Sequence, residues 1–128
     1  MRILLDTHLL LWAAASSKRL TREARELLED AGNDVYYSAA SIWEIAIKSS
    51  LRRRDFRIDL PRLLSALPDM GLIELPITAV HAAGVAGLPP IHRDPFDRLL
   101  IAQSLAEPLV LLTNDALLER YRVGARVV

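Results

Sequence analysis

Short apolar runs alternate with longer helix-like segments along the whole chain, and this alternation constrains the fold more than any other feature. Four runs have the length and composition of buried strands, at residues 2–5, 34–38, 72–76 and 109–113, and residues 125–128 are a fifth candidate. Continuous apolar strands that alternate with helices are typical of a parallel sheet covered on both faces. We therefore predict an α/β fold, a three-layer α/β/α sandwich with a mainly parallel central sheet of four to five strands.

Helices are predicted between these runs, at residues 7–15, 21–32, 39–51, 60–71, 77–88, 96–107 and 114–121. Thr21 is the expected N-cap of the second helix and Gly32 its expected stop. The helix at 60–71 should end near Pro68. A proline-rich loop at 89–95 separates the last two long helices.

The length and composition, with 52% hydrophobic and 25% charged residues, indicate one folded domain, residues 1–128. The 16 basic and 16 acidic side chains give zero net charge, so no global field attracts nucleic acid. The chain has no cysteine, which excludes disulfides, thiolate zinc sites and cysteine nucleophiles. Any metal ion must be held by oxygen or imidazole ligands.

The N-terminus loosely resembles a signal peptide, but Asp6 and His8 interrupt its apolar stretch. The run from Leu9 to Ala15 is far shorter than the roughly 20 residues that span a bilayer. We therefore predict a soluble, cytoplasmic protein that does not associate with a membrane.

Four acidic residues belong to one edge of the predicted sheet. The carboxyl ends of parallel strands and the N-termini of the helices meet there. Asp6 follows the first strand, Glu44 lies in the helix after the second, Asp97 begins the helix at 96–107, and Asp115 follows the strand at 109–113. If the strand order brings them together, their mutual repulsion demands a cation, and an all-oxygen cluster suits Mg²⁺ or Mn²⁺. Such a site can activate water for phosphodiester cleavage.

Each acid also has a simpler interpretation as a helix cap or ion-pair partner. Asp6 can cap the helix behind it, and Glu44 can form a capping box with Ser41 or pair with Lys48. The order Asp94, Pro95, Asp97 fits the N-cap, N1 and N3 positions of a helix. Thr113 or Asn114, which precede Asp115, can cap the final helix. The flanking residues of Glu44 are apolar, and a buried carboxylate is costly unless it is paired or bound to a metal.

Four ordered segments, LLDTHLLLW, SAASIWEIAIK, HRDPFDRLLIAQS and LLTND, resemble the PIN-domain ribonucleases, in particular the VapC toxins of bacterial toxin–antitoxin pairs. The match runs from residue 3 to about residue 121. The resemblance implies a Mg²⁺- or Mn²⁺-dependent endoribonuclease that is neutralised by a cognate antitoxin protein. It also implies a homodimer or a larger toxin–antitoxin assembly.

The resemblance also implies roles for individual residues. The acidic quartet of the family corresponds to Asp6, Glu44, Asp97 and Asp115, with Asp6 and Asp97 as direct metal ligands and the other two completing the site. Thr113 matches the hydroxyl position of the family and would orient a carboxylate or water. Asp97 aligns with the family acid without a gap, and Asp94 is then a neighbour of the site.

Other protein classes fit less well. A response-regulator receiver needs a lysine after its last core strand, and the only lysines are Lys18 and Lys48. A haloacid-dehalogenase phosphatase needs a second acid where this chain has His8. Neither a G-x-G-x-x-G nor a Walker A loop is present. The remaining alternative is a catalytically weak PIN-like RNA-binding or interaction module.

Several further side chains have two interpretations. His81 is expected to be structural, and His92 to be solvent-exposed, with RNA contact as its alternative. Arg98 either pairs with an acid or meets the scissile phosphate. The cluster at 52–57, RRRDFR, is a solvated connection or contacts RNA or the antitoxin. Trp12 and Trp43 are expected to pack in a core or interface rather than stack on bases.

Overall fold

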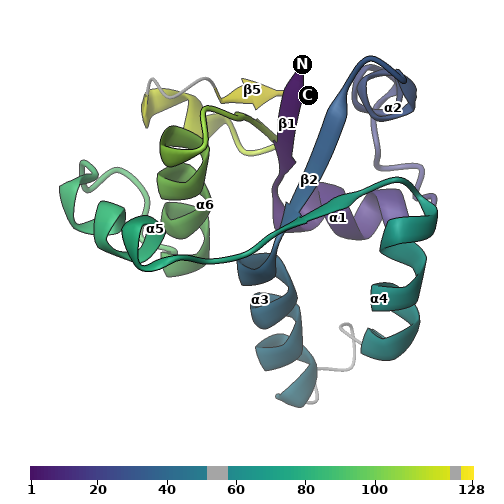
Figure 1. Cartoon of the computed structure of the whole chain (residues 1–128), viewed down its shortest axis with the longest axis horizontal. Helices are drawn as coiled ribbons and strands as arrows, with labels where there is room; N and C mark the ends of the chain where they lie inside the picture. The colour runs from purple at the N-terminus through teal and green to yellow at the C-terminus, as the bar shows by residue number, and fades with distance from the viewer. Residues whose placement is uncertain (52–57, 122–124) are drawn as a thin grey trace.

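A five-stranded, all-parallel sheet with the order β3-β2-β1-β4-β5 forms the centre of the protein (Figure 1). The computed structural model describes residues 1–51, 58–121 and 125–128. The predicted α/β class and parallel sheet are confirmed, because each of the four strand pairs in the described residues is parallel. Within the described residues the strands are β1 (Arg2–Leu5), β2 (Asp34–Ser38), β3 (Ile73–Leu75), β4 (Val110–Thr113) and β5 (Arg126–Val127).

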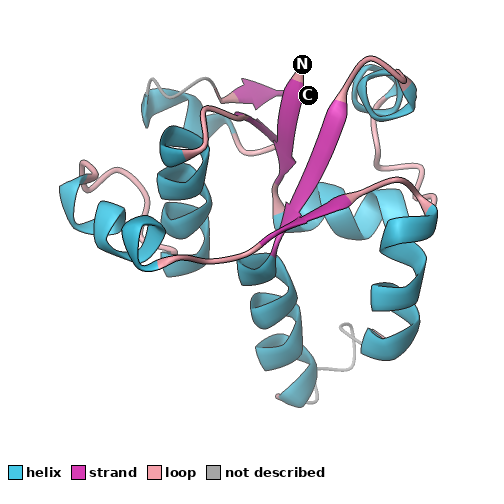
Figure 2. Ribbon diagram, viewed as in Figure 1, coloured by secondary structure: helices cyan, strands magenta, loops and turns pink. Residues whose placement is uncertain are grey.

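Helices connect the strands and cover the sheet, as Figure 2 shows. In the described ranges they are α1 (Thr7–Ala14), α2 (Arg22–Glu29), α3 (Ala39–Ser50), α4 (Leu60–Asp69), α5 (Ala79–Gly84), α6 (Pro95–Ala106) and the 3₁₀ turns η1 (Val85–Gly87) and η2 (Ala116–Tyr121). No helix among these is long and apolar enough to cross a membrane.

Three helices differ from the sequence prediction. The single helix predicted at 77–88 is α5 followed by η1, because the two glycines Gly84 and Gly87 weaken a continuous α-helix. The last predicted helix is a 3₁₀ turn. The helix α2 ends at Glu29, before Gly32, because the backbone of Asp30 is already extended. The N-cap Thr21 and the end of α4 next to Pro68 are as predicted.

Side chains that alternate along the strands supply a separate core on each face of the sheet. Ile3 and Leu5 of β1 pack with α1, α2, α3 and α4, whereas Leu4 packs with α6 and η2. Neighbouring residues of a strand point to opposite faces, so one apolar run serves both cores. Figure 1 shows α5 and α6 on one side of the sheet and α1, α2 and α4 on the other. This arrangement is the three-layer sandwich that the alternation predicts.

The strand order places one edge of the sheet at a topological switch point. The chain leaves β1 toward β2 and β3 on one side, and later returns to β4 and β5 on the other. Open α/β sheets form their sites where the strand order reverses, beyond the carboxyl ends of the strands. Here that point lies between β1 and β4. The helix α6 runs back toward the start of β4, so its N-terminus lies at the same edge.

Candidate active site

Asp6 follows β1 and is the N-cap residue of α1. Its Oδ1 accepts a hydrogen bond from the Leu9 amide at 2.8 Å, and its Oδ2 accepts one from the Thr113 hydroxyl at 2.5 Å. Asp6 is almost fully buried, and burial raises the pKa of its carboxyl although both hydrogen bonds oppose the rise. The capping interpretation is confirmed, and the second carboxylate oxygen links β1 to β4.

Thr113 is the last residue of β4 and lies between two acids. Its buried hydroxyl donates to Asp6 and accepts the Asp115 amide at 3.0 Å. Asp115 in turn accepts the Leu117 amide on Oδ1 at 3.0 Å, which starts η2. The hydroxyl therefore orients a carboxylate, Asp6, and the backbone that carries Asp115.

Glu44 lies in the second turn of α3 and is 5% exposed. Its Oε1 accepts the Thr7 hydroxyl at 2.7 Å, and its Oε2 pairs with Lys48 at 2.6 Å. The predicted pair with Lys48 is confirmed. The predicted capping box with Ser41 is wrong, because β2 passes directly into α3 and the terminal strand residue, Ser38, is the N-cap. The Ser41 hydroxyl instead lies 3.0 Å from that of Thr7.

The start of α6 has the predicted order of cap, proline and acid. Asp94 accepts the amides of Phe96 and Asp97 on Oδ1, at 2.8 and 3.2 Å, and Pro95 is the first helical residue. Asp97 therefore lies in the first turn, with its side chain 23% exposed. Burial raises the pKa of Asp97 to about 7, with further increases from the charges of Asp94, Glu44 and Asp6 and a decrease from that of His92.

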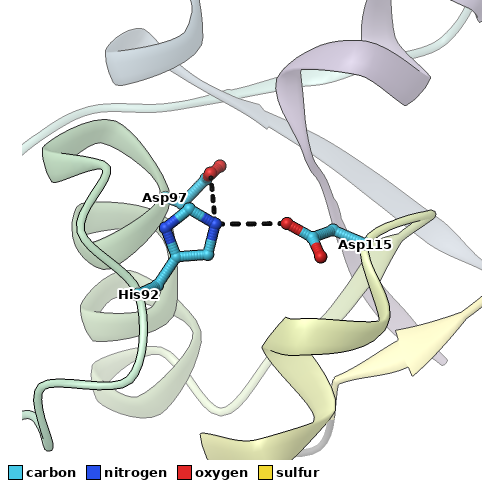
Figure 3. Close-up of side chains that lie close together, drawn as sticks. All are labelled: His92, Asp97 and Asp115. Carbon is cyan, nitrogen blue, oxygen red and sulfur yellow. Dashed lines mark hydrogen bonds and ion pairs between the residues drawn. The ribbon is translucent and has the colours of Figure 1, made fainter.

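His92 contacts two of the acids. The sequence did not indicate this contact. Its Nε2 lies 3.2 Å from Asp97 Oδ2 and is hydrogen-bonded to Asp115 Oδ2 at 3.1 Å (Figure 3). Its side chain is 15% exposed, so the expectation of simple solvent exposure is wrong. The only sequence signal was its place two residues before the cap Asp94, in the loop that leads into α6.

His92, Asp97 and Asp115 form an acid–imidazole cluster whose three facing atoms lie within 4.8 Å of one another. The structure therefore brings together two of the four predicted acids, Asp97 and Asp115. Asp6 and Glu44 lie outside this cluster, but their charges act on Asp97 and raise its pKa. Asp6 is also connected to Asp115 through Thr113.

The donor atoms of this edge fit a hard divalent cation. Carboxylate oxygens are the ligands that Mg²⁺ and Mn²⁺ prefer, and the chain has no thiolate to favour a softer metal. The raised pKa of Asp97 reflects burial and uncompensated negative charge, which a bound cation would offset. Asp6, Asp97 and Asp115 are the acids at the switch point that could hold such an ion, with Glu44 beside them.

Arg98 follows Asp97 but points away from the acids. Its guanidinium donates to the main-chain carbonyls of Val85 and Pro89 at 3.1 and 3.0 Å, with longer contacts to Leu88 and His92. Both predictions for Arg98 are therefore wrong. Its guanidinium neither pairs with an acid in the described residues nor is free to meet a phosphate. Arg98 instead fixes the loop between η1 and α6.

Three other predictions have clear outcomes, and a fourth has none. His81 is buried and structural, with Nδ1 accepting the Thr78 amide and Nε2 2.9 Å from Glu107. Trp12 packs against a core, as predicted. Trp43 is 55% exposed and makes an edge contact with Phe96, so it does not lie in a core of this chain. The cluster at 52–57 lies outside the described residues.

Comparisons with known proteins agree with this geometry. The PIN domain family model matches residues 3–124. Ribonuclease VapC22 of Mycobacterium tuberculosis (strain ATCC 25618 / H37Rv) is 30% identical over 121 residues, which cover 94% of this chain and 92% of the relative.

Similar folds occur in solved toxin–antitoxin complexes. VapBC2 from Rickettsia felis, bound to a promoter DNA fragment, has a TM-score of 0.70 at 18% identity, over 100% of this chain and 98% of that one. VapBC from Salmonella typhimurium, bound to DNA, has a TM-score of 0.66 at 16% identity, over 100% and 97%. FitAB bound to the IR36 DNA fragment has a TM-score of 0.65 at 20% identity, over 98% and 93%. The chain therefore belongs to the PIN-domain family and is a homologue of the VapC ribonucleases.

Proposed function

We propose that this protein is a Mg²⁺- or Mn²⁺-dependent endoribonuclease and the toxin of a toxin–antitoxin pair. The observation that carries the proposal is the convergence of carboxylates at the switch point of the sheet. Asp97 and Asp115 face one another there, and the charges of Asp6 and Glu44 reach Asp97. The ribonuclease name of the 30% identical relative supports the same activity.

Each acid has a role in the proposed site. Asp6 and Asp97 would bind the cation directly, and Glu44 and Asp115 would complete the site. A divalent cation bound there supplies Lewis acidity for the phosphoryl group and lowers the pKa of an attacking water. Thr113 holds Oδ2 of Asp6 by a 2.5 Å hydrogen bond, which fixes the orientation of that carboxylate. Lys48 balances the charge of Glu44, so that the buried acid is tolerated at the edge of the cluster.

The proposed partners follow from the family. RNA is the proposed substrate. The structural neighbours are named as VapBC and FitAB complexes with DNA, and we extend to this chain a cognate antitoxin protein as its partner. A homodimer or a larger toxin–antitoxin assembly in the cytoplasm completes the proposal.

RNA cleavage tests the enzymatic part of the proposal. Purified protein is incubated with RNA in Mg²⁺ or Mn²⁺, with and without EDTA, beside Asp97→Asn. We expect cleavage that requires the metal and is lost in the variant. A matched control is Asp34→Asn, which removes an exposed carboxylate at the opposite end of β2. Cleavage in EDTA, or an active Asp97→Asn protein, would contradict the mechanism, and RNA binding without cleavage would favour the weak-module alternative.

Expression in a bacterial host tests the toxin part. We expect growth arrest from the wild-type chain, relief by the product of a neighbouring small gene, and normal growth with Asp97→Asn. Growth arrest that persists in the Asp97→Asn variant would separate any toxicity from the proposed site.

A further inference from the structure

The start of α6, which positions Asp97, also holds the ring of His92 through the nitrogen Nδ1. Nδ1 accepts a hydrogen bond from the Asp94 amide at 3.0 Å, while the side chain of Asp94 caps the same helix. A backbone amide can only donate, so Nδ1 must present a lone pair. In a neutral imidazole the other nitrogen then carries the hydrogen. The hydrogen bond at Nδ1 therefore makes Nε2 an N–H donor.

That donor faces the two acids of the cluster. Nε2 is hydrogen-bonded to Asp115 Oδ2 at 3.1 Å and lies at an ion-pair distance of 3.2 Å from Asp97 Oδ2. Figure 3 shows that the two carboxylates reach the ring from different elements, Asp97 from α6 and Asp115 from the chain before η2. Two carboxylates that meet at a partly buried site repel each other. An N–H group between them offsets this repulsion without adding a ligand. The contact involves Oδ2 of Asp97 and leaves its Oδ1 for a cation.

The main chain of His92 is also fixed. Its amide donates to the Tyr121 hydroxyl at 2.6 Å, and its carbonyl receives the Arg98 guanidinium at 3.4 Å. Tyr121 is buried at the end of η2, the turn that Asp115 begins. The same contacts therefore connect the loop before α6 to the turn after β4. The ring has a fixed place rather than the freedom of a surface histidine.

We propose that His92 is a positioning residue of the active site. Its Nε2–H donates a hydrogen bond to Asp115 and lies against Asp97, and this bridge between the two acids sets both carboxylates for the cation without binding the metal itself. The inference rests on the proposed function in its reference to a cation. It goes beyond that function because the proposed function gives His92 no role. Groups that orient metal ligands typically change metal affinity by about 10- to 100-fold when they are removed.

Two substitutions separate a positioning donor from a metal ligand. His92→Ala removes the bridge. His92→Gln keeps an N–H donor at a similar reach but has no ring nitrogen to coordinate a metal. His8→Ala is the matched control. His8 is an exposed histidine close to Asp6, and its ring lies beside that of Trp12.

Mn²⁺ binding is measured by the electron paramagnetic resonance signal of free Mn²⁺ during titration. We expect His92→Ala to weaken Mn²⁺ binding by at least about tenfold, His92→Gln to recover most of this loss, and His8→Ala to match wild type. Pulsed spectra of the wild-type Mn²⁺ complex should show no directly coordinated nitrogen. The proposal is overturned if His92→Ala binds Mn²⁺ like wild type, or if a bound nitrogen appears and His92→Gln is as weak as His92→Ala.

A metal-free measurement distinguishes failure of this inference from failure of the proposed function. The ¹⁵N chemical shifts of the His92 ring report which nitrogen carries the hydrogen. We expect Nε2 to carry a hydrogen and Nδ1 to present its lone pair to the Asp94 amide, with a shift change at Nε2 in Asp115→Asn. The Nδ1–H or doubly protonated form would overturn the bridge. If wild type binds no Mn²⁺ but shows the Nε2–H form, the proposed nuclease function fails while the bridge stands.

Discussion

Replacing Asp97 by asparagine should stabilise the metal-free protein at neutral and higher pH while it removes activity. The pKa of Asp97 rises from 3.8 to about 7 in the folded state. The folded protein therefore favours the protonated carboxyl, and folding becomes less favourable as this group ionises. The sign follows from linkage: the full stability is present below pH 4 and is lost as the pH rises toward 7.

The size of the effect follows from the same shift. At about 1.4 kcal/mol per pKa unit, a rise from 3.8 to about 7 corresponds to a ceiling of about 4 kcal/mol above pH 7. Asp97 is 23% exposed, so solvent screens part of the repulsion. We therefore expect Asp97→Asn to be about 2 kcal/mol more stable than wild type at pH 8 and nearly equal to it at pH 4.

Urea unfolding in EDTA at pH 4 and pH 8 measures this difference. With a typical slope of about 1–3 kcal/mol per molar urea, the midpoint at pH 8 should shift by about 1 M. Asp34→Asn is the matched control and should follow wild type at both values, because Asp34 is exposed at the far end of β2. Saturating Mg²⁺ should stabilise wild type and not Asp97→Asn. The reasoning is refuted if Asp97→Asn and wild type unfold together at pH 8.

Substitutions at three further residues test contacts around the site by urea unfolding. Thr113→Val leaves a buried oxygen of Asp6 without its donor and should lower the free energy of unfolding by about 1–3 kcal/mol. Thr113→Ser keeps the hydroxyl and should retain most of this stability. An equal loss of stability in both variants would argue against the hydrogen bond. Asp94→Ala removes the N-cap of α6 and should cost about 1 kcal/mol, whereas Asp94→Asn should cost little; equal stabilities would show that capping is unimportant. Arg98→Lys cannot reach several carbonyls at once and should cost about 1–3 kcal/mol; an unchanged midpoint would contradict its role in fixing the loop.

Local features of the site were predictable because they depend on short stretches of chain. The order Asp94-Pro95-x-Asp97 fits a helix start wherever it occurs. Pro has no N–H to satisfy, and the cap side chain accepts hydrogen bonds from the next free N–H groups. Asp6 and Thr113 belong to the carboxyl ends of strands, and a parallel sheet gathers those ends at one edge. The pair of Glu44 and Lys48 follows from one helical turn.

The errors arose where the surrounding structure, rather than the local residue pattern, decides which contacts a residue makes. The capping box of Ser41 and Glu44 was a correct local pattern, but Ser38 took the N-cap because β2 runs into α3 without a loop. Arg98 binds carbonyls of a loop, which carry no signal in the residue types. His92 looked like a loop histidine because Asp115 and Tyr121, its two distant partners, lie 23 and 29 residues away.

The sequence by itself determined the parallel α/β class, most of the helix starts and the acids that belong to the carboxyl edge of the sheet, because hydrophobic periodicity and capping act over a few residues. Only the tertiary structure decided how these acids divide among partners. The strand order β2-β1-β4 brings Thr113 to Asp6, and the packing of α6 and η2 on one face brings Asp97 and Asp115 to His92. Which charges meet depends on contacts between distant segments, and these exist only once the sheet and its two cores have assembled.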